Sequence, residues 1–139
     1  MDYFDLIDTI RSGPRGVFRL GWLRRLPNLN EFFVHHEDVR RANGGRRRDL
    51  DSAMNQALWS NVRSGAFYLT RRLRGAGLDI HNVVTGQTVR ARRGTMTSHL
   101  TGEPGELLLY LFGRRAIAEV EIDGPTTATE RLKTARIGL

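Results

Sequence analysis

A carboxylate and an imidazole stand four residues apart in the segment NLNEFFVHHEDVRRA, which spans residues 28–42. If this segment is helical, Glu31 and His35 emerge from the same face, one turn apart. An oxygen and a nitrogen placed in this way can both reach one cation. Asp38 lies three residues further along that face, where it could orient the His35 ring through a hydrogen bond. The spacing therefore predicts two ligands of a divalent metal.

The same residues also have a purely structural explanation. A capping box places a glutamate at the position of Glu31 when Asn28 is the N-cap of the helix. The run from His35 to Asp38 can equally be a solvated polar face. His36 points about 100° away from His35 around the helix axis and is a poorer ligand partner. On spacing alone, a metal site and a capped surface helix both remain open.

Two amphipathic helices are predicted in the first half of the chain. One runs from the Asn28 cap to the stop at Asn43-Gly44-Gly45, and a longer one follows an Asp49 cap and ends at Gly75. Such helices cannot bury their apolar faces alone, so they suggest half of an antiparallel bundle. The apolar stripe of the longer helix contains Phe67. We expect part of this stripe to stay uncovered, which favours a homodimer; the residues concerned are Leu50, Leu58, Val62 and Leu69.

The hydrophobic period changes near Gly77. Strands are predicted at 78–84, 87–93, 95–101 and 117–122, with helices at 106–112 and 126–136. The predicted fold class is α+β. A partial helix bundle occupies residues 1–75, including a short helix at 2–11, and a β-β-β-α-β-α module occupies residues 76–139.

The string that holds Glu31 and His35 resembles the signature of actinobacterial DinB-like metal-binding proteins, a group related to the mycothiol-dependent maleylpyruvate isomerases. A second string, GEPGELLLYLFGRRAIAEVEIDG at residues 102–124, resembles the C-terminal module of that group, with Gly113-Arg114 and Asp123-Gly124 at the matching places. The resemblance covers about residues 15–139. It implies that the helical part is a partial DinB-like four-helix bundle.

The resemblance also implies roles for particular residues. Glu31 and His35 match two metal ligands, with zinc as the expected ion, and Arg114 matches a candidate for substrate binding. The third ligand of the family is a histidine on an earlier bundle helix, and no histidine precedes His35 here. The resemblance therefore implies an N-terminally truncated member of the group.

The activity implied is that of a thiol-dependent isomerase or transferase. The metal would bind the thiol cofactor mycothiol and lower its pKa, so that the thiolate attacks a small-molecule substrate that the sequence does not identify. The missing histidine favours an alternative, a non-catalytic binding protein with a degraded metal site. Whether the chain is an enzyme stays open.

Composition limits the other functional classes. The chain has 139 residues, no cysteine and a net charge of +7, and all but one of its 22 basic residues are arginine. The arginine clusters are spread over several elements, and we find no reading motif or base-stacking aromatics, which argues against nucleic-acid binding as a third hypothesis. No apolar run approaches the ~20 residues that span a bilayer, and the acidic N-terminus is unlike a signal peptide. We expect a cytoplasmic protein that does not enter membranes.

Overall fold

The computed structural model describes the backbone of residues 18–138 and the side chains of residues 29–138. The short helix predicted at 2–11 lies outside these residues. The elements are α2 (Phe18–Ala42), α3 (Ser52–Leu69), β1 (Gly77–Asn82), β2 (Thr88–Arg92), β3 (Thr97–Gly102), α4 (Pro104–Leu111), β4 (Glu121–Asp123) and α5 (Thr126–Thr134). The fold is α+β, and the order β-β-β-α-β-α after residue 76 is as predicted.

The four strands form one mixed sheet in the order β2-β1-β3-β4. Strand β1 pairs antiparallel with β2 on one side and parallel with β3 on the other, and β4 pairs antiparallel with β3. The chain therefore leaves β1 through a hairpin to β2 and then crosses to the far side of β1. Alternation along the two central strands turns Leu78, Ile80 and Leu100 into the core, where all three are fully buried.

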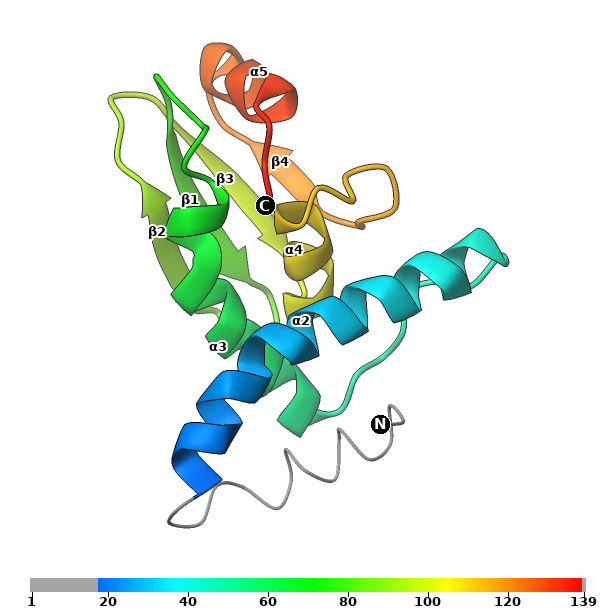
Figure 1. Ribbon diagram of the computed structural model, residues 1–139. Coiled ribbons are helices and arrows are strands. Elements are labelled where there is room, and N and C mark those ends of the chain that lie inside the picture. Colours follow the sequence, from blue (N-terminus) through cyan, green and yellow to red (C-terminus); the bar gives the residue numbers. More distant parts are fainter. Residues whose placement is uncertain (1–17, 139) are drawn as a thin grey trace.

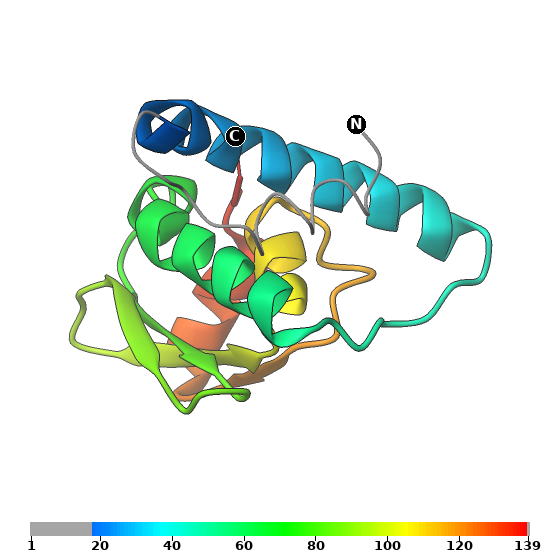
Figure 2. The same cartoon turned by 90° about the horizontal axis from the view of Figure 1, so that it is seen from below.

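The helices are stacked on the sheet in layers. Helices α3 and α4 lie next to the sheet, and α2 lies outside them and crosses α3 (Figures 1 and 2). Helix α4 is mostly apolar apart from Glu106, and every residue from Pro104 to Leu111 is buried. A helix of this kind needs partners on all sides, which α2, α3 and β3 provide.

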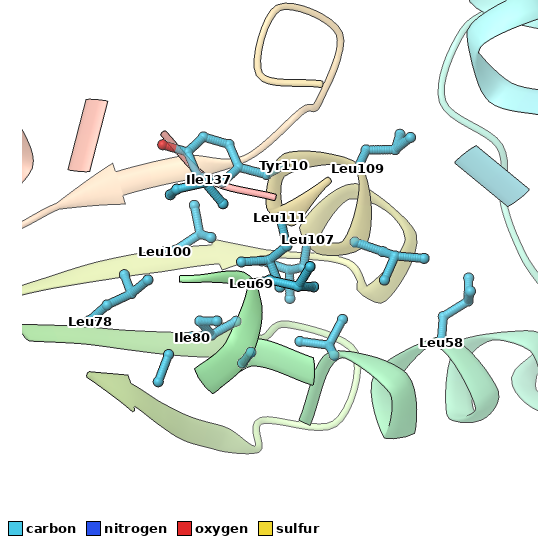
Figure 3. Packing of buried hydrophobic residues seen from close by; sticks show 14 of the residues in the cluster. Leu58, Leu69, Leu78, Ile80, Leu100, Leu107, Leu109, Tyr110, Leu111 and Ile137 are labelled. Atoms are coloured by element: carbon cyan, nitrogen blue, oxygen red, sulfur yellow. The ribbon is translucent and has the colours of Figure 1, made fainter. Parts of the chain in front are cut away.

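The core is a single cluster that extends from Leu29 on α2 to Ile137 near the C-terminus. Figure 3 shows leucines of α4 meeting side chains of α3 and of the sheet. The prediction that the stripe on α3 stays uncovered is wrong, because α4 and the sheet cover it. Leu58, Val62 and Leu69 are buried, and Leu50 is half-buried against the same cluster.

Phe67 is not part of that core, although the sequence placed it in the stripe. Its side chain is 68% exposed. The helical spacing explains this position, since Phe67 follows Ser60 and Arg63 by seven and four residues, and both of these are exposed. Phe67 therefore lies on the polar face of α3.

Both predicted helix starts require correction. Helix α2 begins at Phe18 and continues through Pro27, so Asn28 is not its N-cap and Glu31 lies well inside it. Proline removes one backbone hydrogen bond and commonly bends a helix, and Figure 1 shows α2 changing direction along its length. Helix α3 is capped by Asp51, not by Asp49. The Asp51 carboxylate accepts a hydrogen bond of 2.8 Å from the Met54 amide.

None of the described helices combines the length and the apolar composition that crossing a membrane requires.

Candidate functional site

The two predicted ligands lie together on the outer face of α2. Glu31 and His35 are both exposed and are separated by one turn of a helix that extends in both directions beyond them. With Asn28 inside the helix, the capping-box explanation of Glu31 no longer holds. Neither side chain forms a hydrogen bond or an ion pair with any residue whose side chain is described. Both are therefore available to an external partner.

The neighbouring imidazole is engaged by protein groups. The His36 ring stacks on Phe32 with a centroid separation of 6.0 Å and an interplanar angle of 4°. Its Nδ1 atom lies 2.9 Å from Nη2 of Arg48. Because a guanidinium can only donate, this contact requires an unprotonated Nδ1 that accepts the bond. His36 thus has a packing role between α2 and the loop that precedes α3.

Glu37 is the buried charge of this helix, with 1% of its surface exposed. Arg40 and Arg41 on the following turn donate to its two carboxylate oxygens at 3.2 and 2.9 Å, and Arg48 donates as well. Burial by itself would raise the pKa of Glu37, but the hydrogen bonds and charges of the three arginines outweigh it and lower that pKa. Glu37 is therefore ionised and fully paired.

Arg41 carries this network from α2 to α4. Its Nη1 and Nη2 atoms donate to both carboxylate oxygens of Glu106 at 2.8 and 2.7 Å, and Nη1 also donates to the Ile117 carbonyl. The bonds to Glu106 raise the pKa of Arg41. Glu106 also accepts a 3.0 Å bond from the Glu119 amide. The network fixes α2 against α4 and the loop that follows α4, and it sets the position of the Glu31 and His35 face.

Asp38 and Arg114, two residues singled out separately from the sequence, are in contact with each other. The Arg114 guanidinium donates to both Asp38 oxygens, with the shortest distance 3.1 Å, and it also donates to the Phe112 carbonyl at 2.7 Å. Both side chains are about one third exposed. No hydrogen bond joins Asp38 to His35 among the described side chains. The orienting role of Asp38 and the substrate-binding role of Arg114 stay predictions.

The sequence-based reasoning missed the network around Glu37. The signal was present, because Glu37 precedes Arg40 and Arg41 by three and four residues, the spacing of helical ion pairs. No spacing in the sequence indicates that Arg48 and Glu106 also belong to this network. These residues reach Glu37 and Arg41 from a loop and from another helix, and only the tertiary fold brings them there.

In chemical terms, the outer face of α2 offers one carboxylate and one imidazole. In the part of the chain with described side chains, no three histidine, cysteine, aspartate or glutamate residues are grouped so as to hold a metal ion. A cation bound at Glu31 and His35 would need further ligands from outside the described side chains, because zinc sites in proteins have three or four protein ligands.

Comparisons with profiles of protein families, with curated proteins and with solved structures returned no match to this chain.

Proposed function

We propose that this chain is a cytoplasmic metal-binding protein similar to the mycothiol-dependent maleylpyruvate isomerases, with Glu31 and His35 as two ligands of a divalent ion, preferably zinc. The helical part would then be a partial DinB-like bundle. The resemblance of the segment around these residues motivates the proposal. The chemistry fits, because zinc accepts both carboxylate oxygen and imidazole nitrogen.

One observation supports this choice of ligands over their neighbours. The segment from Glu31 to Asp38 holds five carboxylate or imidazole side chains. Three of them have protein partners, with His36 bonded to Arg48, Glu37 to its arginines and Asp38 to Arg114. The two that remain without a described partner, Glu31 and His35, are the pair at ligand spacing.

The residues of the chain have distinct tasks in this proposal. Glu31 supplies a negative charge and His35 a neutral nitrogen, held by a helix that the Glu37 network fixes in place. Zinc would supply Lewis acidity that lowers the pKa of a coordinated thiol such as mycothiol and so favours the nucleophilic thiolate. Arg114 lies one third exposed beyond Asp38 and would bind an anionic group of a small-molecule substrate.

Zinc titration of the purified chain against a chromogenic chelator tests the ligand assignment. We expect weak binding that His35→Ala or Glu31→Gln reduces by about tenfold or more, because a metal held by few protein ligands loses much of its affinity with any one of them. His36→Ala should have a smaller effect. His99→Ala, which removes an exposed histidine of β3, is the matched control and should leave affinity unchanged.

Zinc binding that survives both Glu31→Gln and His35→Ala would show that the metal is held elsewhere. The same titration with a low-molecular-weight thiol present addresses catalysis. Ultraviolet absorption from a zinc-bound thiolate, lost in His35→Ala, is expected if the thiol-dependent activity is right. Zinc binding without any thiolate signal would instead favour the non-catalytic binding protein.

A further inference from the structure

Two aromatic side chains lie exposed at the C-terminal end of α3, away from the α2 face. Phe67 is 68% and Tyr68 56% exposed. Each has an arginine over its ring, with the Arg92 guanidinium carbon 4.3 Å from the Phe67 centroid and that of Arg71 4.1 Å from the Tyr68 centroid. Two arginine–aromatic pairs are thus exposed at the end of α3, where the sequence had placed Phe67 in the apolar stripe of the helix.

Backbone carbonyl groups hold both guanidiniums in place. Arg92 donates from Nε to the Thr70 carbonyl at 2.9 Å and from Nη2 to the Phe67 carbonyl at 2.8 Å. Arg71 donates from Nη1 to the carbonyls of Tyr68 and Gly138, each at 3.0 Å. These bonds cap the end of α3. The other N–H groups of both arginines have no acceptor among the described residues, so they are free to bind an anion without reordering the side chains.

A hollow of about 430 Å³ adjoins the Phe67 ring and is lined along its other side by residues 90–93 of β2 and the turn that follows. Strand β2 is an outer strand of the sheet (Figure 1). Arg90 forms a cross-strand pair with Asp79 at 2.9 Å, and Arg93 is exposed. The hollow therefore combines one aromatic wall with a wall of positive charge.

Most of the net charge of the chain lies in the segment of sequence that supplies this surface. Residues 63–93 contain seven arginines and one aspartate, whereas the remaining residues hold 15 basic and 14 acidic side chains. In the sequence these arginines form separate clusters. The fold brings two of them together, since Arg92 of β2 bonds to the carbonyls at the end of α3, directly before Arg71, Arg72 and Arg74.

We propose that this surface, formed by Phe67, Tyr68, Arg71, Arg92 and the rest of the hollow at residues 90–93, binds single-stranded nucleic acid. Single strands are bound by positive grooves along the phosphates together with aromatic rings or arginine planes on which bases stack. A duplex offers its base edges and not its base faces, so it would leave the arginine–aromatic pairs unused. An anionic membrane would favour rings free to insert, but here a guanidinium lies over each ring.

Fluorescence anisotropy of a labelled oligo(dT) of about 16 nucleotides, a length that covers such sites, measures the interaction. The double variant Phe67→Ala/Tyr68→Ala should weaken binding by about tenfold, because two stacking contacts are lost. Its salt dependence should stay the same, because no charge changes. Tyr68→Phe keeps an aromatic face and should bind like the parent. Both aromatic side chains are exposed, and thermal unfolding will verify that the variants fold.

The arginines are tested through the salt dependence. Arg90→Gln/Arg93→Gln should lower the slope of log K against log salt by about 1.4, which corresponds to two phosphate contacts on a single strand. The matched control Arg46→Gln/Arg136→Gln removes the same charge from exposed positions outside the hollow and should change the slope far less.

Unchanged affinity in the aromatic double variant would overturn the proposal, as would tighter binding to a duplex of the same length. Binding to phosphatidylserine vesicles without binding to the oligonucleotide would overturn it in favour of a membrane surface.

Discussion

The two glutamates on α2 differ in whether the carboxylate is buried and paired with other residues of the protein. Glu37 is almost completely buried and paired with three arginines, whereas Glu31, less than two turns earlier on the same helix, is exposed and has no partner among the described residues. A buried carboxylate holds the fold only while its partners remain, since an unpaired buried charge is costly. An exposed carboxylate contributes little to stability and can bind a ligand without weakening the fold.

Replacing Glu37 by glutamine should therefore destabilise the protein strongly. The change leaves Arg40, Arg41 and Arg48 without their shared carboxylate, and we expect a loss of about 3 kcal/mol in the free energy of unfolding. Urea denaturation measures this loss. The control Glu31→Gln should change stability by less than about 0.5 kcal/mol, because that side chain has no described partner. Equal effects of the two variants would contradict the assigned role of the network.

The lowered pKa of Glu37 predicts a particular dependence on pH. A carboxyl whose pKa is lower in the folded than in the unfolded protein stabilises the fold above its unfolded pKa, here near the ordinary value of 4.5. That contribution is lost as the pH falls through the folded-state pKa. We expect the unfolding free energy of the parent to fall in this acidic range and that of Glu37→Gln to fall less. Parallel pH profiles for the two proteins would count against the pairing.

At the scale of elements, local signals predicted most of the architecture. The change of period near Gly77 and the turns that followed it predicted every strand and helix of the second half, with ends displaced by a few residues. Local signals failed where tertiary contacts decided the outcome. Pro27 and Asn28 suggested a helix start, yet α2 passes through them. The apolar stripe on α3 suggested an open face, because nothing in the sequence states that α4 packs there.

Two glycines give a matched pair of tests, because a Cβ atom would clash at one of them and fit at the other. A Cβ atom on Gly94 would lie 2.3 Å from the backbone nitrogen of Gly77, where the turn before β3 touches the start of β1. Gly94→Ala should therefore destabilise the protein by about 2 kcal/mol, because the backbone itself must shift. On Gly65, inside α3, the Cβ would make only an ordinary 3.4 Å contact with Leu69. Gly65→Ala should stabilise by up to about 1 kcal/mol. Thermal unfolding of both variants compares the two directions of change.

At the scale of the whole molecule, the two proposed surfaces are separate. The ligand pair lies on α2, the outermost layer, and the arginine–aromatic pairs lie at the junction of α3 and β2. The sequence predicted self-association because the α3 stripe was expected to be exposed. That reason no longer applies, because the stripe is buried. The exposed ligand pair offers a different route to a homodimer, because a second copy related by a twofold axis would present the same two ligands again.

We therefore predict that zinc promotes dimerisation of the chain. In the absence of a thiol, a second Glu31–His35 pair would fill the coordination positions that the thiol takes in the proposed function, which gives a four-ligand site. Sedimentation equilibrium should show a shift to higher mass on adding zinc and a return on adding a chelator. His35→Ala should stay at the mass of the metal-free protein. A dimer that forms equally well without zinc would show that the copies meet through another surface.

The position of β2 at the edge of the sheet has a consequence for aggregation. An outer strand presents unpaired backbone groups to which the strand of another molecule can add. Here the exposed edge strand carries Arg90 and Arg92, and a second strand approaching it would bring its own arginines against them. The opposite edge is β4, which is only three residues long and offers little to pair with. Charge at one edge and the short strand at the other should keep the protein from polymerising through its sheet. The arginines proposed to bind phosphates would therefore also oppose aggregation in concentrated solution.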